Sequence, residues 1–262
     1  MNSNGTNHVG VNLAFTKFLF VTPARDDDAA RTQLRGAGAI VGRGFFNDFE
    51  AEGRDAPPQE TIQFLINENG HQQAGLAGAR YALQVSSKYR PRLQETEVEL
   101  RRRLAGNATV TAIDGAVRVP QYTSAEMHAY AYKGASARMS GRVQRTVIII
   151  PIRKTQEWWE KSALDRHAYF YPHTDSVSGA HVKGHARAAE AGISTIYRRL
   201  YYNPDGAGRE GEFDFITYFE CADEHVATFD QICRSLRDER QNPEWRYVVE
   251  GPEWRGRRVL KW

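Results

Sequence analysis

Apolar residues form a nearly continuous run at 145–152 (RTVIIIPI), whose β-branched side chains predict a strand buried on both faces. Two further apolar runs, 193–202 and 213–220, flank the turn-rich segment NPDGAGREGE and predict a hairpin. An apolar stripe at helical spacing over 223–239 predicts a helix, and the short run 245–251 predicts a last strand.

Helix-favouring residues dominate between the first of these strands and the hairpin. Residues 154–170 and 178–192 predict two helical pieces, the second weakened by Gly184 and closed by Gly192. The second half of the chain therefore predicts the order β-α-β-β-α-β, which is the ferredoxin-like arrangement.

The first half shows the same order of elements with weaker signals. Residues 11–21 alternate as a strand, 25–36 predict a helix with acidic residues at its start, and 80–119 predict strand, helix and strand. We therefore expect an α+β protein of two ferredoxin-like (βαββαβ) domains with antiparallel sheets, spanning residues 1–135 and 136–262.

Composition and charge exclude a few classes of function. The chain has 262 residues, 41% of them hydrophobic, and a formal net charge of +3. It has no run of basic residues interleaved with aromatic ones, which argues against nucleic-acid binding. No apolar run approaches membrane-spanning length, and the polar start lacks the pattern of a signal peptide, so we expect a cytoplasmic protein. Cys221 and Cys233 form no CxxC motif and are predicted to be reduced.

Two segments resemble binding sites only superficially, and a third is an insert. The glycine-rich residues 35–44 follow a predicted helix instead of the strand that a phosphate-binding loop requires, so we expect a flexible loop. The acidic run RDDDAAR at 25–31 is predicted to be a helix start rather than a cation site. The insert 48–63 is predicted to be a surface loop.

Three histidines, His173, His181 and His185, lie within thirteen residues. His181 and His185 are four apart, so a helix would place both on one face, as a pair of non-haem metal ligands requires. Because Gly184 weakens that helix, histidines with ordinary surface hydrogen bonds remain the alternative to a metal site.

A cation is predicted on an apolar strand face close to these histidines. Arg198 shares its face with Ile196 and Leu200, and such a guanidinium needs an anion, a ligand or access to water. The partner strand adds a face of Phe213, Phe215, Thr217 and Phe219. An apolar slot with an imidazole, cations and aromatic side chains suits a flat cofactor with acidic edges, and haem fits this description.

Two motifs resemble the chlorite dismutase family of haem enzymes. RTVIIIPIRKTQEWWEKS is similar to the family's strand that ends in proline and basic residues before a tryptophan pair. RRLYYN and FDFITYFE are similar to its Arg-x-Leu-Tyr strand and the strand that follows. The resemblance covers the part of the chain after residue 120. It implies two ferredoxin-like domains in an arrangement of the dimeric α+β barrel type, with haem b in the C-terminal domain.

The resemblance also implies a role for individual residues. His185 is implied as the proximal iron ligand, at the family's spacing from the distal, catalytic Arg198. The other residues implied to contact or support the haem are Lys154 and Tyr122 at the propionates, Trp158 and Trp159 beside the ring, Thr217 and Phe219 in the distal pocket, and Glu244 behind the histidine.

The sequence departs from the family pattern at two points. The interval between Trp159 and His185 is longer than is usual in the family and contains His173, which is a rival iron ligand. The glutamate that supports the proximal histidine is expected near Gln241, between Glu239 and Glu244, and the segment PEWRYV favours Glu244.

The implied activity is the conversion of chlorite to chloride and dioxygen. In the family's reaction, haem takes an oxygen atom from chlorite, and the arginine holds the resulting hypochlorite near the oxoferryl centre until the two recombine. Two alternatives stay open, namely a haem peroxidase-like member with another substrate and a cofactor-free α+β binding module. The resemblance further implies a homo-oligomer, with a pentamer favoured.

Overall fold

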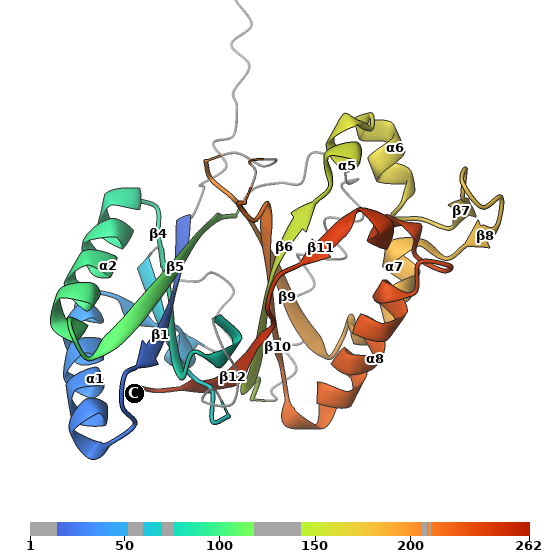
Figure 1. Cartoon of the computed structure of the whole chain (residues 1–262). Coiled ribbons are helices and arrows are strands. Elements are labelled where there is room, and N and C mark those ends of the chain that lie inside the picture. Colours follow the sequence, from blue (N-terminus) through green and yellow to red (C-terminus); the bar gives the residue numbers. More distant parts are fainter. Residues whose placement is uncertain (1–14, 52–59, 70–75, 118–142, 206–208, 210) are drawn as a thin grey trace, which may run out of the picture.

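The fold consists of two groups of strands and helices that follow each other along the chain. The computed structural model describes residues 15–51, 60–69, 76–117, 143–205, 209 and 211–262 (Figure 1). The strands of the first half are β1 (Phe15–Pro23), β2 (Phe46–Asn47), β3 (Glu60–Ile66), β4 (Tyr81–Ser87) and β5 (Ala108–Ala116). Its helices are α1 (Asp28–Val41) and α2 (Arg90–Leu104), with short 3-10 turns η1 (Asp48–Ala51) and η3 (Leu76–Gly78).

The second half repeats this order with a more divided first helical region. Its strands are β6 (Thr146–Lys154), β9 (Ile196–Tyr202), β10 (Phe215–Cys221), β11 (Val248–Glu250) and β12 (Trp254–Val259), with a hairpin of β7 (His173–Thr174) and β8 (His181–Val182). Its helices are α5 (Gln156–Glu160), α6 (Ala163–Ala168), α7 (Gly184–Ala188) and α8 (Val226–Arg237). The 3-10 turns are η5 (Glu190–Gly192), η6 (Asp223–His225) and η7 (Pro243–Tyr247).

The main strands form two antiparallel sheets that join into one barrel. The strand order is β5-β1-β4-β3 in the first half and β12-β6-β10-β9 in the second, with β11 also paired to β6. The sheets meet where β12 pairs with β3 and where β9 pairs with β5, so the ring of strands is closed. Closure covers the edges that open sheets leave unpaired. The α+β fold with ferredoxin-like halves in a barrel is therefore confirmed.

Helices cover the outer faces of the barrel. Figure 1 shows α1 and α2 on one side and α7 and α8 on the other. The barrel interior is filled by apolar side chains from both halves, among them Phe18, Tyr218 and Trp254. Along β9, Tyr197 and Tyr201 belong to this interior, whereas Ile196 and Leu200 pack on the side of α7 and α8. Arg198 therefore faces the helices, as the alternation of the strand predicts.

Four details of the predicted elements are wrong. The glycine-rich segment 35–44 is not a loop, since α1 continues to Val41, and the missing side chain of Gly38 lets Phe64 and Trp262 approach that helix closely. The insert 48–63 contains the start of β3. Segment 178–192 is not one helix, because the β7–β8 hairpin occupies its first part. The strand β12, which pairs with β3, was not predicted because its arginines obscure the apolar alternation.

Other element predictions are confirmed. The acidic run is a helix start, where the Asp27 side chain accepts a hydrogen bond from the Ala30 backbone. The predicted hairpin corresponds to β9 and β10, which pair along their whole length. Among the described residues, no helix combines the length and apolar character needed to cross a bilayer.

Candidate functional site

A buried histidine, a carboxylate and an ammonium group form the centre of the site. His185 on α7 donates from Nδ1 to Glu244 Oε2 at 2.8 Å, and Lys154 Nζ at the end of β6 donates to Glu244 Oε1 at 2.6 Å. The exposed fractions of His185, Glu244 and Lys154 are 9%, 4% and 6%. One carboxylate from η7 thus orients the imidazole and compensates the lysine charge.

Electrostatics fix the protonation of this group. Burial acts to raise the pKa of Glu244, but the charge of Lys154 and the contact with His185 outweigh it and hold that pKa well below its usual range. Burial lowers the pKa of His185, and the charges of Arg198 and Lys154 add to this effect against the opposing effect of Glu244. Glu244 is therefore an anion, and His185 is a neutral imidazole with its proton on Nδ1.

The second ring nitrogen of His185 is the atom of the site that can bind a ligand. Nε2 is buried and has no hydrogen-bond partner among the described residues. Buried polar atoms in folded proteins are normally partnered, so such an atom needs an explanation. A neutral imidazole whose Nδ1 is fixed by a carboxylate presents a lone pair on Nε2 to a ligand such as iron.

Backbone contacts hold the start of α7, the helix that carries His185. Gly184 has a φ of 72°, and a Cβ at this position would collide with the Tyr171 backbone. The Gly184 amide donates to the Gln241 carbonyl at 3.2 Å, and the His185 amide donates to the Tyr169 carbonyl at 3.0 Å. The helix is short, but its first turn is held from two directions.

The strand faces opposite α7 provide an apolar wall with one cation. Arg198 lies directly across from Phe219 on the adjacent strand. It is half-buried, and its Nε atom is buried without a hydrogen-bond partner among the residues that the structure describes. Thr217 faces the same way and donates its hydroxyl to the Ile150 carbonyl at 2.9 Å. Phe219 packs edge-on against Phe229 of α8, with ring centroids 5.0 Å apart.

The adjacent tryptophans occupy different environments. Trp158 is fully buried, with Lys154 Nζ 4.0 Å from its ring centroid. Trp159 stacks on Phe215 at 5.9 Å and belongs to the apolar cluster between β6, β9, β10 and the helices. Trp158 thus supports the charged group from behind, while Trp159 lies at the wall that bears Thr217.

The structure brings together most of the side chains that were predicted for the site, with one residue outside the described range. His185, Lys154, Trp158 and Glu244 form one contiguous group, and Glu244 rather than the exposed Glu239 contacts the histidine. Tyr122 lies outside the described residues.

The buried ammonium of Lys154, which is predicted to contact a haem propionate, is engaged by Glu244, since a buried cation requires a close anion. Its contact with a propionate stays a prediction. One interpretation of the site needs correction. His181 lies on β8 and is exposed, so it shares no helix face with His185. No group of three or more potential metal ligands occurs among the described residues.

His173, the rival iron ligand, occupies a different setting. It lies on β7, and its Nδ1 atom is 2.8 Å from the Tyr171 carbonyl. Its ring meets Tyr169 edge-on, with centroids 5.4 Å apart. Since no carboxylate contacts it in the described structure, the combination of features found at His185 is absent from His173.

Sequence reasoning missed the residues that enclose this group from behind. Tyr169 and Tyr247 lie 5.6 and 5.8 Å from the Trp158 ring. Asp175 and Arg246 form an ion pair at 2.7 Å beside them. These contacts could not be predicted because the partners are far apart in the sequence. The position of Arg246 two residues after Glu244 could have indicated that it lies near the site.

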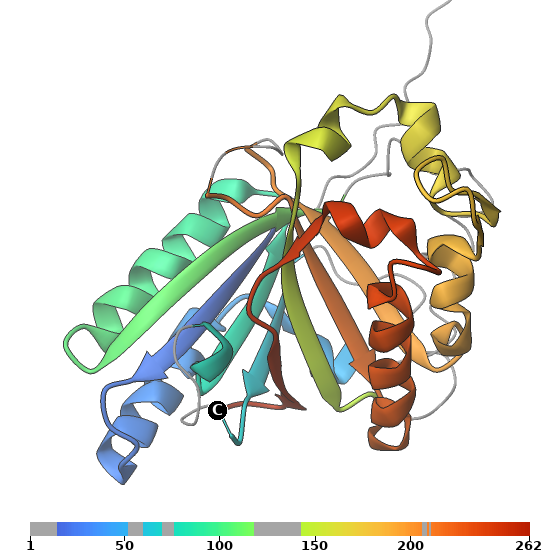
Figure 2. The same ribbon diagram turned by 45° about the vertical axis from the view of Figure 1, so that its right-hand side comes forward.

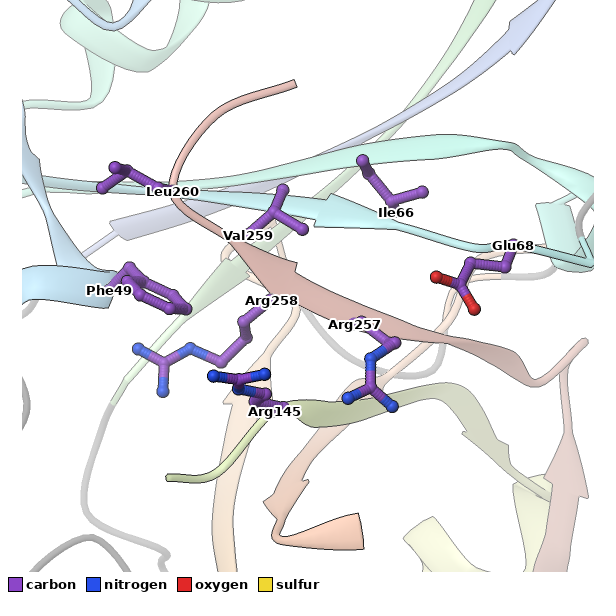
Figure 3. Close-up of a pocket in the computed structure, with 8 residues that line it drawn as sticks. All are labelled: Phe49, Ile66, Glu68, Arg145, Arg257, Arg258, Val259 and Leu260. Carbon is purple, nitrogen blue, oxygen red and sulfur yellow. The ribbon is translucent and has the colours of Figure 1, made fainter. Parts of the chain in front are cut away.

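A pocket of about 330 Å³ lies away from this site, at the seam of β3 and β12 (Figure 3). None of the predicted site residues lines it. Two of its arginines have carboxylate partners, since Arg257 pairs with Asp223 at 2.8 Å and Arg258 approaches Glu220 at 3.5 Å. Arg258 also donates to the Asp48 carbonyl at 3.0 Å, so this arginine links the second half of the chain to the first at the seam.

The residues at His185 fit haem. A buried imidazole whose Nε2 atom has no partner in the described part of the chain, a carboxylate behind it and a facing apolar wall are the elements of a proximal haem site. The Nε atom of Arg198, which no described residue contacts by a hydrogen bond, adds a donor for an anion on that wall.

Comparisons with known proteins agree with this description. No family model matches the sequence. The structure is similar to a chlorite dismutase from Candidatus Nitrospira defluvii, solved as a variant with a tryptophan and an arginine replaced, with a TM-score of 0.64 and 18% identity over 94% of this chain and 91% of the other. The same enzyme in complex with imidazole gives a TM-score of 0.62 and 19% identity over the same shares. The chain therefore has the fold of the chlorite dismutases.

Proposed function

We propose that this chain belongs to the chlorite dismutase family and is a haem b enzyme that converts chlorite to chloride and dioxygen. The observation that carries the proposal is the buried His185, whose Nδ1 is held by Glu244 while Nε2 has no partner among the described residues. The shared fold supports the same conclusion.

Each residue of the proximal group has a distinct task in this proposal. His185 Nε2 would bind the iron, and bound haem would supply the redox chemistry. Glu244 would keep the proton on Nδ1 and strengthen the imidazole as a donor. Lys154 would keep Glu244 ionised, because its ammonium lies 2.6 Å from the carboxylate. The indoles of Trp158 and Trp159 would exclude water from this side.

Arg198 would act on the substrate side of the haem. Its half-buried guanidinium lies on an apolar wall, where an anion is held more strongly than in water. Chlorite and hypochlorite are both small anions, so one cation would bind the substrate and retain the intermediate. Thr217 and Phe219 would line this pocket, and Tyr122 would reach a propionate.

The activity test uses haem-loaded protein, chlorite and an oxygen electrode. Arg198→Gln should retain the haem spectrum and lose about 10²–10³-fold in kcat, the range typical for removal of one preorganised donor. Arg199→Gln is the matched control, since Arg199 is the next residue of β9 and lies on the opposite face. Undiminished oxygen release by Arg198→Gln would refute the role of Arg198.

Oxygen release by the wild type decides the reaction itself. A haem-loaded wild type that releases no oxygen would contradict chlorite conversion and favour the peroxidase-like alternative. A protein that binds no haem would favour the cofactor-free alternative. A homo-oligomer with a pentamer favoured, a cytoplasmic location, and the division into domains 1–135 and 136–262, whose boundary lies outside the described residues, stay predictions.

A further inference from the structure

The residues between α5 and α7 form a brace around the proximal group, defined here as residues 161–183. This is the interval that is longer than the family resemblance predicts. It contains α6 and the β7–β8 hairpin, which projects at the side of the helices in Figure 1. A segment of this length could extend away from the site, so its contacts with the proximal group suggest a role there.

A buried carboxylate lies at the tip of this brace. Asp175 is 1% exposed, and its Oδ2 atom accepts from the Ser178 amide at 2.8 Å, the Ser178 hydroxyl at 2.6 Å and Arg246 Nη2 at 2.7 Å. Burial acts to raise the pKa of Asp175, but the Arg246 and Ser178 hydrogen bonds outweigh it and lower that pKa. A buried charge of this kind is costly unless it is paired.

The partner of Asp175 lies on the turn that carries Glu244. Arg246 and Glu244 are both in η7, two residues apart. A 3-10 turn has about three residues per turn, so a restraint on Arg246 restricts the backbone at Glu244. The brace makes a further contact with η7, because Lys161 Nζ lies 4.5 Å from the Tyr247 ring centroid.

The brace also holds the other end of the His185–Glu244 hydrogen bond. The Tyr169 carbonyl accepts from the His185 amide at 3.0 Å, and the Phe170 carbonyl accepts from the Ala186 amide at 3.0 Å. Donor and acceptor of the 2.8 Å contact are therefore anchored to one segment. An exposed ion pair would contribute too little energy to anchor η7 to the brace. Asp175, however, is buried, and the side chain of Arg246 is mostly covered.

We propose that the Asp175–Arg246 ion pair is a positioning device that fixes Glu244 against Nδ1 of His185 and thereby sets the donor strength of the proximal imidazole. The inference rests on the proposed function for the iron. It concerns residues that touch neither haem nor substrate, so Asp175 and Arg246 are positioning residues and not catalytic ones.

The test compares the variants Asp175→Asn and Arg246→Gln, which remove the ion pair, with Arg246→Lys. The lysine keeps a cation that can donate a hydrogen bond to Asp175. Asp238→Asn is the control, because Asp238 forms an exposed ion pair with Arg240 shortly before η7. In ferrous haem protein, resonance Raman should show the iron–histidine stretch at lower frequency in the first two variants, with haem affinity reduced about tenfold. Arg246→Lys should recover part of both effects, and Asp238→Asn should match the wild type.

A second measurement separates this inference from the proposed function. In haem-free protein, heteronuclear NMR should show a His185 Nδ1–H that exchanges slowly with water, and faster exchange in Asp175→Asn. Folded Asp175→Asn and Arg246→Gln proteins with unchanged exchange would overturn the positioning role. A wild type that shows the protected Nδ1–H but no iron–histidine stretch would instead overturn the proposed haem function alone.

Discussion

The helix-facing sides of the two sheets share a topology but differ in their polar groups. In the first half, the buried Lys17 ammonium lies between Glu97 at 2.7 Å and Asp114 at 2.9 Å, so its charge is compensated within the protein. In the second half, Lys154 and Glu244 are paired, but His185 Nε2 and Arg198 Nε have no partner among the described residues. The helix-facing side of the second sheet thus offers a donor and a lone pair that no described residue uses.

The difference follows from what covers each sheet. The long helices α1 and α2 close the first side over an apolar core. On the second side, the segment that corresponds to α1 is divided into short helices and a hairpin, as Figure 2 shows beside the long α8. Among these short helices, α7 presents His185 from a backbone that is held by hydrogen bonds to Tyr169 and Gln241. One topology can therefore serve as scaffold in one half and as binding site in the other.

The two buried lysines provide the largest expected effect. Lys154→Met should lower the free energy of unfolding by about 3–5 kcal/mol, because it leaves the buried Glu244 without its cation. Lys17→Met should cost less, since Glu97 keeps Arg101 at 2.9 Å and Asp114 is one-third exposed. Urea unfolding of the haem-free proteins measures both values. A larger loss for Lys17→Met would contradict the comparison.

A pair of glycines with positive φ tests how rigidly each half is built. Gly184→Ala should destabilise the protein by more than the roughly 1–2 kcal/mol of a left-handed residue, because the new Cβ would also meet the Tyr171 backbone. Gly106→Ala, in the turn after α2, should show only that conformational cost, since no atom of the described residues lies within 4 Å of the new Cβ. Thermal unfolding compares the stability of the two variants. Equal destabilisation would show that the backbone at the start of α7 shifts easily to accommodate a Cβ atom.

The pH dependence of stability should reveal the buried imidazole. The pKa of His185 is lowered in the folded state, so the unfolded chain binds its proton first as pH falls below about 6.5. The contribution of neutral His185 to the free energy of unfolding is fully present above that pH. It is lost as the pH falls towards the pKa of the folded state, by about 1.4 kcal/mol for each pH unit between the two pKa values. His185→Gln should flatten this limb of the stability curve, while the exposed His181→Gln should not. An unchanged slope in His185→Gln would mean that the imidazole titrates normally.

The sequence predicted more of the fold than of the site. The β-branched run of β6 and the alternation of β9 and β10 were sufficient for the second sheet, and that alternation placed Arg198 on the correct face. The contacts of Lys154 could not be predicted in this way, because its partner lies 90 residues away on a 3-10 turn with no periodic pattern. The strand β8 falls in the segment 178–192 that the sequence predicts as helix, because two-residue strands leave no hydrophobic signature.

The central claim is that the second half binds haem through His185. Haem titration followed by the Soret band, with the coordination read by electron paramagnetic resonance, tests it most directly. We expect saturable binding by the wild type and by His173→Ala, and loss of the histidine-ligated ferric signal in His185→Ala. Retention of that signal in His185→Ala, or its loss in His173→Ala alone, would contradict the assignment of His185 as the iron ligand.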